Sequence, residues 1–88
     1  MSTYTLKIVT PNEVVFEGPV EHVLLPAAEG YMGILASHAP FVSPVTSGKL
    51  EYREPGDKTT TLKVTGGFVE VRKDRVLVLT DTVEKNTH

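Results

Sequence analysis

Residues 29–48 read EGYMGILASHAPFVSPVTSG, and this stretch decides the fold class. Its apolar residues come closer to a helical stripe than those of any other window of the chain. Gly30, Gly33 and Pro40 interrupt the stripe, because glycine weakens a helix and proline cannot continue one. Only Glu29 among these twenty residues carries a full charge. The stretch therefore predicts a core-lining loop, a partner surface or the remains of an active site.

Alternating apolar and polar residues on both sides of this stretch predict β-strands. Tyr4, Leu6 and Ile8 alternate with Thr5 and Lys7, which is a period of two. Proline, glycine, asparagine and aspartate, which favour turns, cluster between the apolar runs at residues 10–12, 17–19, 54–57 and 72–74. The other runs are residues 14–16, 20–25, 50–53, 62–65, 69–71 and 76–79. Strands at this spacing predict an all-β sandwich or flattened barrel.

The composition indicates one globular domain and excludes several classes of function. With 88 residues the chain has room for one core, and 40% hydrophobic with 23% charged residues argues against disorder. The net charge of −2 supplies no basic surface for nucleic acid. The chain has no cysteine, which excludes disulfides, thiolate zinc sites and cysteine nucleophiles and favours the cytosol. No apolar run approaches the roughly 18–20 residues that span a bilayer, and the N-terminus does not have the pattern of a signal peptide.

Histidine chemistry is disfavoured by the spacing of the residues. A hydrolytic site could be drawn from Ser37, His38 and Asp81, but adjacent residues of an extended segment point to opposite faces. The histidines at positions 22, 38 and 88 lack the spacing of metal ligands. The acidic residues occupy strand and turn positions that fit solvated side chains better than an acid–base pair. We therefore expect no catalytic residue and no metal.

A phosphate-binding loop is also excluded. Ser47, Gly48 and Lys49 resemble the end of such a motif. The motif needs a glycine where this chain has Ser43, and serine or threonine where it has Leu50. We expect no nucleotide and no other cofactor.

Lys58 supports one alternative function. Lipoyl and biotinyl carrier domains are small β-sandwiches with a modified lysine at a hairpin tip. The segment Pro55–Asp57 before Lys58 has the composition of such a tip, although it is also good turn chemistry by itself. The carrier alternative predicts covalent modification of Lys58.

Two motifs resemble a known family. The pattern E-G-x-x-G-I-L-x-x-H-A-P over residues 29–40 and the pattern G-G-F-x-E-V over residues 66–71 are similar to those of the epsilon subunit of the F-type ATP synthase, called delta in mitochondria. Further matching residues are spread over nearly the whole chain. The family usually has proline in place of Ala36, and some members have an acidic residue in place of Tyr31.

The resemblance implies a ten-stranded flattened β-sandwich in the central stalk. Such a domain is a non-catalytic rotor subunit that joins the gamma shaft to the ring of c subunits and couples proton flow to ATP synthesis. It implies a peripheral position on the cytoplasmic face of the bacterial inner membrane, without insertion into the membrane. The residues implied to face gamma are Thr10, His38, Ala39, Pro40, Phe41 and Val42, and those of a loop facing the c ring are Glu29, Gly30, Tyr31, Met32 and Gly33.

The end of the chain gives two further expectations. The β-domain is expected to cover residues 1–83, followed by a short frayed tail at residues 84–88 and no C-terminal helical hairpin. The hairpin of longer relatives inhibits ATP hydrolysis and in some of them binds ATP. A naturally short chain, which we expect here, would have neither that inhibition nor nucleotide sensing.

Overall fold

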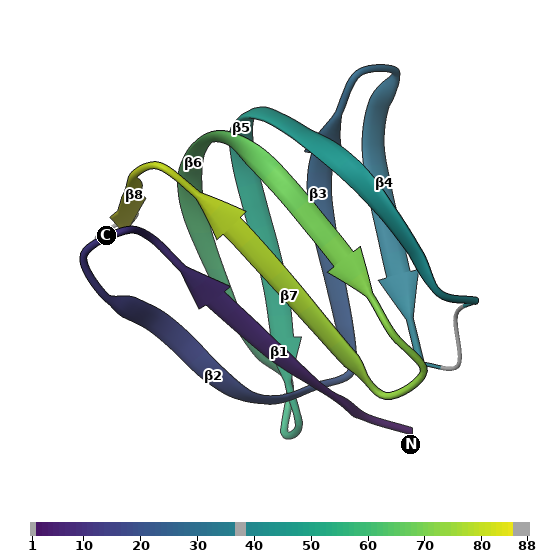
Figure 1. The fold of residues 1–88 in the computed structure, drawn as a ribbon. Helices are drawn as coiled ribbons and strands as arrows, with labels where there is room; N and C mark the ends of the chain where they lie inside the picture. The colour runs from purple at the N-terminus through teal and green to yellow at the C-terminus, as the bar shows by residue number, and fades with distance from the viewer. Residues whose placement is uncertain (1, 37–38, 86–88) are drawn as a thin grey trace.

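The computed structural model describes residues 2–36 and 39–85, and every regular element among them is a strand. Figure 1 shows the two layers that these strands form. The strands are β1 (Tyr4–Val9), β2 (Val14–Val20), β3 (His22–Ala27), β4 (Gly30–Leu35), β5 (Phe41–Glu54), β6 (Lys58–Val71), β7 (Arg75–Thr80) and β8 (Val83–Lys85). The predicted all-β sandwich is confirmed.

The strands form one open sheet that folds over on itself. Its order is β2-β1-β7-β6-β5-β3-β4, and β8 pairs with the first half of β6. All neighbours are antiparallel except β1 and β7, which are parallel. The first layer holds β2, β1, β7 and the second half of β6, and the second layer holds β3, β4 and the second half of β5 (Figure 1).

The long strands β5 and β6 carry the chain from one layer to the other. Each has 14 residues, and they pair in one unbroken register along their length. The face that is buried changes in the middle of both strands. In β5 the buried residue before the middle of the strand has an odd number (Val45), and those after it have even numbers (Leu50 and Tyr52). In β6 the order is reversed, with Leu62 and Val64 buried first and Val69 and Val71 afterwards.

Two glycines make this change possible in β6. Gly66 has φ +96° and Gly67 has φ +137°, and residues other than glycine rarely adopt such positive φ angles. A Cβ atom on Gly67 would lie 1.8 Å from the backbone oxygen of Leu79 in the neighbouring strand. Gly67 is therefore required both for its backbone conformation and for the close approach of β7.

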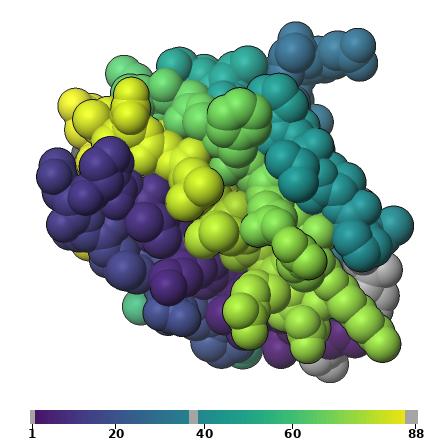
Figure 2. Space-filling view, viewed as in Figure 1, coloured from purple at the N-terminus to yellow at the C-terminus, as the bar shows by residue number. Residues whose placement is uncertain are grey.

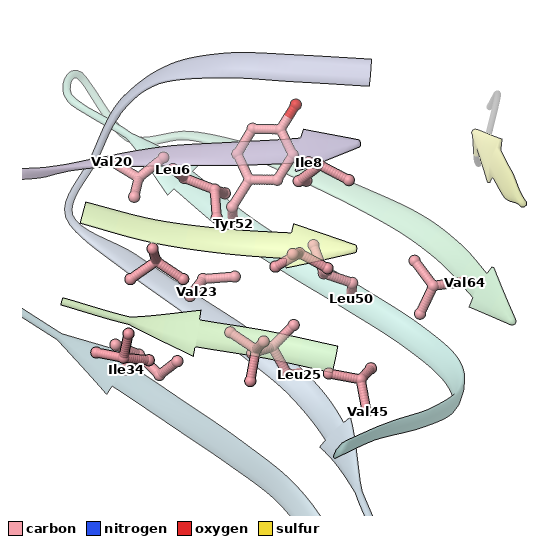
Figure 3. Packing of buried hydrophobic residues seen from close by; sticks show 14 of the residues in the cluster. Leu6, Ile8, Val20, Val23, Leu25, Ile34, Val45, Leu50, Tyr52 and Val64 are labelled. Atoms are coloured by element: carbon pink, nitrogen blue, oxygen red, sulfur yellow. The ribbon is translucent and has the colours of Figure 1, made fainter. Parts of the chain in front are cut away.

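The core fills the space between the two layers, as Figure 3 shows. Alternate residues of the strands point into it, which is what the period of two predicted. Its fully buried members are aliphatic, and two tyrosines lie at its borders. The buried hydrophobic residues are Tyr4, Leu6, Ile8, Val20, Val23, Leu25, Ile34, Val45, Leu50, Tyr52, Leu62, Val64, Val69, Val71, Val76 and Val78.

Two contacts of tyrosines link strands that are not neighbours in the sheet. The Tyr4 hydroxyl of β1 donates a hydrogen bond to the backbone carbonyl of Ile34 in β4, with a distance of 2.5 Å. The ring of Phe16 in β2 lies against the ring of Tyr52 in β5, with centroids 4.3 Å apart. These contacts hold the edge strands β2 and β4 against the rest of the molecule.

Three details of the predicted strand pattern were wrong or are not confirmed. The described residues form eight strands rather than ten, and β5 and β6 each run through both layers. The predicted turn at residues 17–19 lies inside β2. This edge strand tolerates Pro19, because its outer side pairs with no other strand of the described sheet. Residues 30–35, predicted as loop, form the strand β4.

The sheet also extends past the predicted domain boundary at residue 83. Strand β8 places Glu84 and Lys85 opposite Lys63 and Leu62 of β6. The remaining three residues of the predicted tail lie outside the described part of the chain.

We expect Gly67→Ala to destabilise the protein by about 2–5 kcal/mol, because it adds both backbone strain and a clash with the backbone of β7. The measurement is the free energy of unfolding from denaturant titration. Gly56→Ala is the matched control, since Gly56 also has positive φ but open space around it. It should cost only about 1–2 kcal/mol. Equal losses in the two variants would contradict the role given to Gly67.

We expect Tyr4→Phe to cost about 1–2 kcal/mol, because it leaves the Ile34 carbonyl without its partner. Burial raises the pKa of the Tyr4 hydroxyl, so the unfolded chain loses this proton at lower pH than the folded protein does. The stability of the unaltered protein should then fall as the pH rises above about 10. The variant should show a shallower fall in an unfolding series across this range. If the stability of the variant fell with pH as steeply as that of the unaltered protein, the buried Tyr4 hydroxyl would not be the cause of the fall.

Candidate protein-interaction surface

The β3–β4 hairpin forms a projecting tip at one end of the molecule. Ala27 pairs with Gly30, so the connecting turn consists of Ala28 and Glu29. Gly30 has φ +117°, and a Cβ atom there would contact nothing within 4 Å. Figure 2 shows this tip standing clear of the body, and Tyr31 beside it is 58% exposed.

The residues predicted to form a ring-facing loop are mainly part of a strand. Glu29 lies in the turn, while Gly30, Tyr31, Met32 and Gly33 belong to β4. The expectation of a loop was wrong because the glycines do not end the strand here. Tyr31 is exposed and Met32 packs partly against the core, as alternation along a strand requires.

The residues predicted to face gamma divide into buried and exposed ones. Ala39, Pro40 and Val42 are exposed, and Val42 is 66% exposed. Phe41 is half-buried and packs against the core, so part of its role is structural. His38 lies outside the described residues.

Thr10 has a structural role in the turn between β1 and β2. Its side chain is buried, and its hydroxyl accepts hydrogen bonds from the backbone N–H groups of Asn12 and Glu13, both at 3.2 Å. Thr10 nonetheless lines a groove at the surface, which is described below.

A row of apolar side chains crosses the outer face of the first layer. Phe68 of β6 pairs with Pro44 of β5 on one side and with Leu79 of β7 on the other. Leu79 pairs in turn with Val9 of β1, and Val9 pairs with Val14 of β2. We call these five residues the apolar row. Three of them are large and about half exposed: Val14 at 52%, Phe68 at 55% and Leu79 at 46%.

A groove opens along one side of the apolar row. Its volume is about 490 Å³, and it lies where β6 bends between the layers. The backbone of Gly66 and Gly67 and the side chains of Phe68 and Leu79 form part of its wall. Val9 at the end of β1 and Thr10 directly after it also border the groove, as does Asp81 after β7. Alternation along the sequence could not identify Phe68 and Leu79 as surface residues. Both lie next to buried valines in apolar runs, so the sequence does not distinguish the face in the core from the face in water.

The described residues supply no arrangement for catalysis or metal binding. They contain no group of three or more histidine, cysteine or acidic side chains that could hold a metal ion. Ser37, His38 and His88, which the sequence raised as candidates, lie outside the described part. Ser47, Gly48 and Lys49 lie within strand β5, where no phosphate-binding turn can form. In the same residues no helix has the length and apolarity needed to cross a membrane.

Residues 3–86 match the family model described as ATP synthase, Delta/Epsilon chain, beta-sandwich domain. The chain belongs to this family. The epsilon-type β-sandwich that the two motifs indicated is therefore confirmed for nearly the whole chain.

The similar curated proteins are ATP synthase epsilon chains. The chain of Brevibacillus brevis is 39% identical over 84 residues, which are 96% of this chain and 64% of the relative. The chain of Desulforamulus reducens is 43% identical over 83 residues, or 94% of this chain and 62% of the relative. The chain thus spans less than two thirds of the length of these relatives. Their names agree with the expectation of a non-catalytic subunit.

Solved structures show the same fold. A chain in the structure of the OSCP/F1/c-ring part of the Euglena gracilis mitochondrial ATP synthase has a TM-score of 0.90 at 26% identity. The match covers 97% of this chain and 54% of that one. A chain from the central stalk and c-ring of the Tetrahymena thermophila enzyme has a TM-score of 0.78 over 92% of this chain and 65% of that one. Because its identity is 15%, the second match speaks for the fold alone.

The contrast between Phe41 and Val42 gives a prediction for stability. Phe41→Asp should destabilise the isolated chain by about 2–4 kcal/mol, because it places a charge against the core. Val42→Asp should change the stability by no more than about 0.5 kcal/mol, since that side chain is 66% exposed. Thermal and denaturant unfolding of the two variants checks this. A stable Phe41→Asp variant would make Phe41 a surface residue, as the sequence first suggested.

Proposed function

We propose that this chain is a non-catalytic rotor subunit of a proton-translocating F-type ATP synthase. It binds the gamma shaft and the ring of c subunits and makes them turn as one body, so that proton flow is coupled to ATP synthesis. It works as a peripheral part of the complex on the cytoplasmic face of the bacterial inner membrane. The observation that carries the proposal is the family match over residues 3–86.

The shape of the molecule supports a role with two separate contacts. The β3–β4 tip projects from one end of the molecule (Figure 1). The exposed residues Ala39 and Pro40 lead into β5, and Val42 is exposed near its start. We assign the tip, with Glu29 and Tyr31, to the c ring. We assign the segment at residues 38–42, together with Thr10, to gamma.

The mechanics of coupling require a stiff element with interfaces that do not slip. Most of the sheet is paired on both sides, and its core is closed by the Tyr4 and Phe16 contacts. Permanent protein interfaces are large and apolar, so a free subunit of such a complex exposes apolar surface. The exposed Tyr31 and Val42 fit that expectation. No cofactor, metal or nucleotide is needed for this role.

The carrier alternative rests on Lys58 at the β5–β6 hairpin. Residues 55–57 form the turn, and the side chain of Lys58 is 73% exposed. Its ammonium lies 3.9 Å from the carboxylate of Glu54, which is a weak surface ion pair. Intact mass of the protein from its native host separates the two functions. An added lipoyl or biotinyl mass would decide for the carrier.

The rotor role is tested by ATP-driven proton pumping in membrane vesicles that carry an ATP synthase stripped of its own epsilon subunit. The 88-residue chain should restore pumping. Tyr31→Ser should lower the restored pumping about fivefold, because the loss of one exposed anchor at the ring costs about 1 kcal/mol. Binding to gamma should stay unchanged in this variant.

Lys58→Ala is the matched control, since it alters an exposed residue near the other hairpin tip, at the opposite end of the molecule (Figure 1). It should restore pumping as well as the unaltered chain does. Failure of the unaltered chain to restore pumping would contradict the rotor role. Equal pumping by Tyr31→Ser and the unaltered chain would contradict the contact assigned to the tip.

A further inference from the structure

We propose that the outer edge of β4 is a self-association site, at which two copies of this chain pair β4 against β4 in antiparallel orientation. The pairing joins the second layers of the two molecules into one continuous sheet. It concerns the free chain, so the inference goes beyond the proposed function. Three features of β4 carry it: an open edge, the absence of charge, and a spacing of side chains that fits a second copy of the strand.

Strand β4 ends the sheet and offers main-chain groups to a further strand. Its neighbour is β3, and no second strand of the described sheet pairs with it (Figure 1). The β3–β4 turn has two residues, and Pro26, which has no N–H group, pairs with Tyr31. In an antiparallel hairpin with such a turn, alternate residues direct their main-chain groups towards the neighbour and away from it. The N–H and C=O groups of Tyr31 and Gly33 therefore point outward.

The edge of β4 has none of the residues that usually prevent strands from pairing between molecules. Charged side chains and prolines protect edge strands. Strand β2 carries Glu17 and Pro19, and β8 carries Glu84 and Lys85. The start of β5 pairs with β6 alone in the described sheet, and it carries Pro44. The six residues of β4 include no charge and no proline. Among the edges of the described sheet, β4 is therefore the one left open to another strand.

The outward side chains of β4 fit a second copy when Tyr31 of each copy lies opposite Gly33 of the other. Two main-chain hydrogen bonds then form in each of these two pairs. Each Tyr31 ring covers the backbone of the opposite Gly33, and such aromatic–glycine pairs stabilise glycines in strands. Leu35 follows Gly33 on the same face, and Tyr31 and Leu35 are each 58% exposed in the single chain. The pairing thus covers large apolar side chains that the free edge leaves in water.

The two-fold axis of this pairing passes between the two Met32 side chains. Met32 is half-buried on the inner side of β4. A hollow of about 410 Å³, lined in part by Tyr31, Met32 and Ser43, gives these flexible side chains room to pack. Every contact of a two-fold interface occurs twice. An unrelated strand would need an aromatic residue and a small one at matching places, which a second copy supplies by symmetry.

Charge does not oppose the pairing. Glu29 directly precedes β4, and in this register it lies opposite Leu35 of the other copy, whose neighbour in the sheet is His22. The two Glu29 residues are then about 20 Å apart, at opposite ends of the paired strands. This separation exceeds the Debye length of about 8 Å at physiological salt. Like charges therefore do not meet across the interface.

The contact is short, so the dimer is weak. A strand of six residues is about 20 Å long, and one pair of such strands buries less than the roughly 1,200 Å² of a stable interface. We expect Kd of about 10–100 μM. Under the proposed function Tyr31 faces the ring, so a chain paired in this way cannot also take its place in the rotor. The pairing then protects the open edge of the free chain.

Sedimentation equilibrium of the full 88-residue chain measures this association. Between about 5 μM and 1 mM the average mass should rise from that of one chain towards that of two. Tyr31→Lys should raise Kd at least about tenfold, because it removes the ring and brings two cations close together across the axis. Phe68→Lys is the matched control, since Phe68 is 55% exposed on another face and the change adds the same charge. It should leave Kd unchanged.

Amide hydrogen exchange of the unaltered chain, followed by NMR, identifies the paired edge. The amides of Tyr31 and Gly33 should exchange about fivefold more slowly or better at about 1 mM than at low concentration, because the dimer covers them. The amides of Met32 and Ile34, which face β3, should be protected at both concentrations. This alternation separates strand pairing from contact through side chains.

Three outcomes would overturn the inference. The first is a chain that stays monomeric up to about 1 mM. The second is a dimer that Phe68→Lys dissociates and Tyr31→Lys does not, because its interface would lie on the outer face of the first layer. The third is exchange of the Tyr31 and Gly33 amides that does not depend on concentration, which counts even where a variant loses stability in unfolding curves. The experiment contains no other subunit of an ATP synthase, so its result is independent of the proposed function.

Discussion

The change of buried face in the middle of β5 and β6 is the constraint on which the rest of the structure depends. Two strands of 14 residues stay paired in one register while both turn a different set of side chains to the core. Without this change, either the first or the second half of each strand would present its valines and leucines to water. Burying an aliphatic side chain is worth about 1.5–3 kcal/mol, so three such residues on the wrong face would cost an amount comparable with the whole stability of an ordinary small domain.

The bend also creates the candidate interaction surface. Gly66 and Gly67 leave a groove because they carry no side chains, and the turn of the chain brings Phe68 to the outside directly after it. The same backbone conformation therefore serves the core on one side and exposes an aromatic ring on the other. A residue with a side chain at position 67 would meet the backbone of β7, so this arrangement has little freedom to vary. The fold and the surface are two consequences of one pair of glycines.

The sequence predicted the all-β class and most of the core, but the strand β4 and the outer faces escaped it. Leu6, Ile8 and their polar neighbours alternate clearly, so one buried face could be read directly. In β7, Val78 is buried while the adjacent Leu79 is exposed, and nothing in the two side chains distinguishes them. Which of them enters the core is decided by pairing with β6 and β1, distant in the sequence. Strand β4 escaped because both of its faces carry apolar residues and its glycines suggested a loop.

Stiffness between the two proposed contacts is what a coupling element needs most. The tip at Glu29 and Tyr31 belongs to the second layer, whereas Val42 pairs with Glu70 in the first layer. Strands β5 and β6 run through both layers of the described sheet, and the Tyr4–Ile34 and Phe16–Tyr52 contacts join the layers as well, so torque can pass by several connections. Each layer is held by backbone hydrogen bonds, and the close-packed core resists sliding of one layer over the other. Under the proposed function, a hinge at the bend would let the ring turn without the shaft. The tight approach of Gly67 to β7 argues against such a hinge, because the bend has no free space into which it could open.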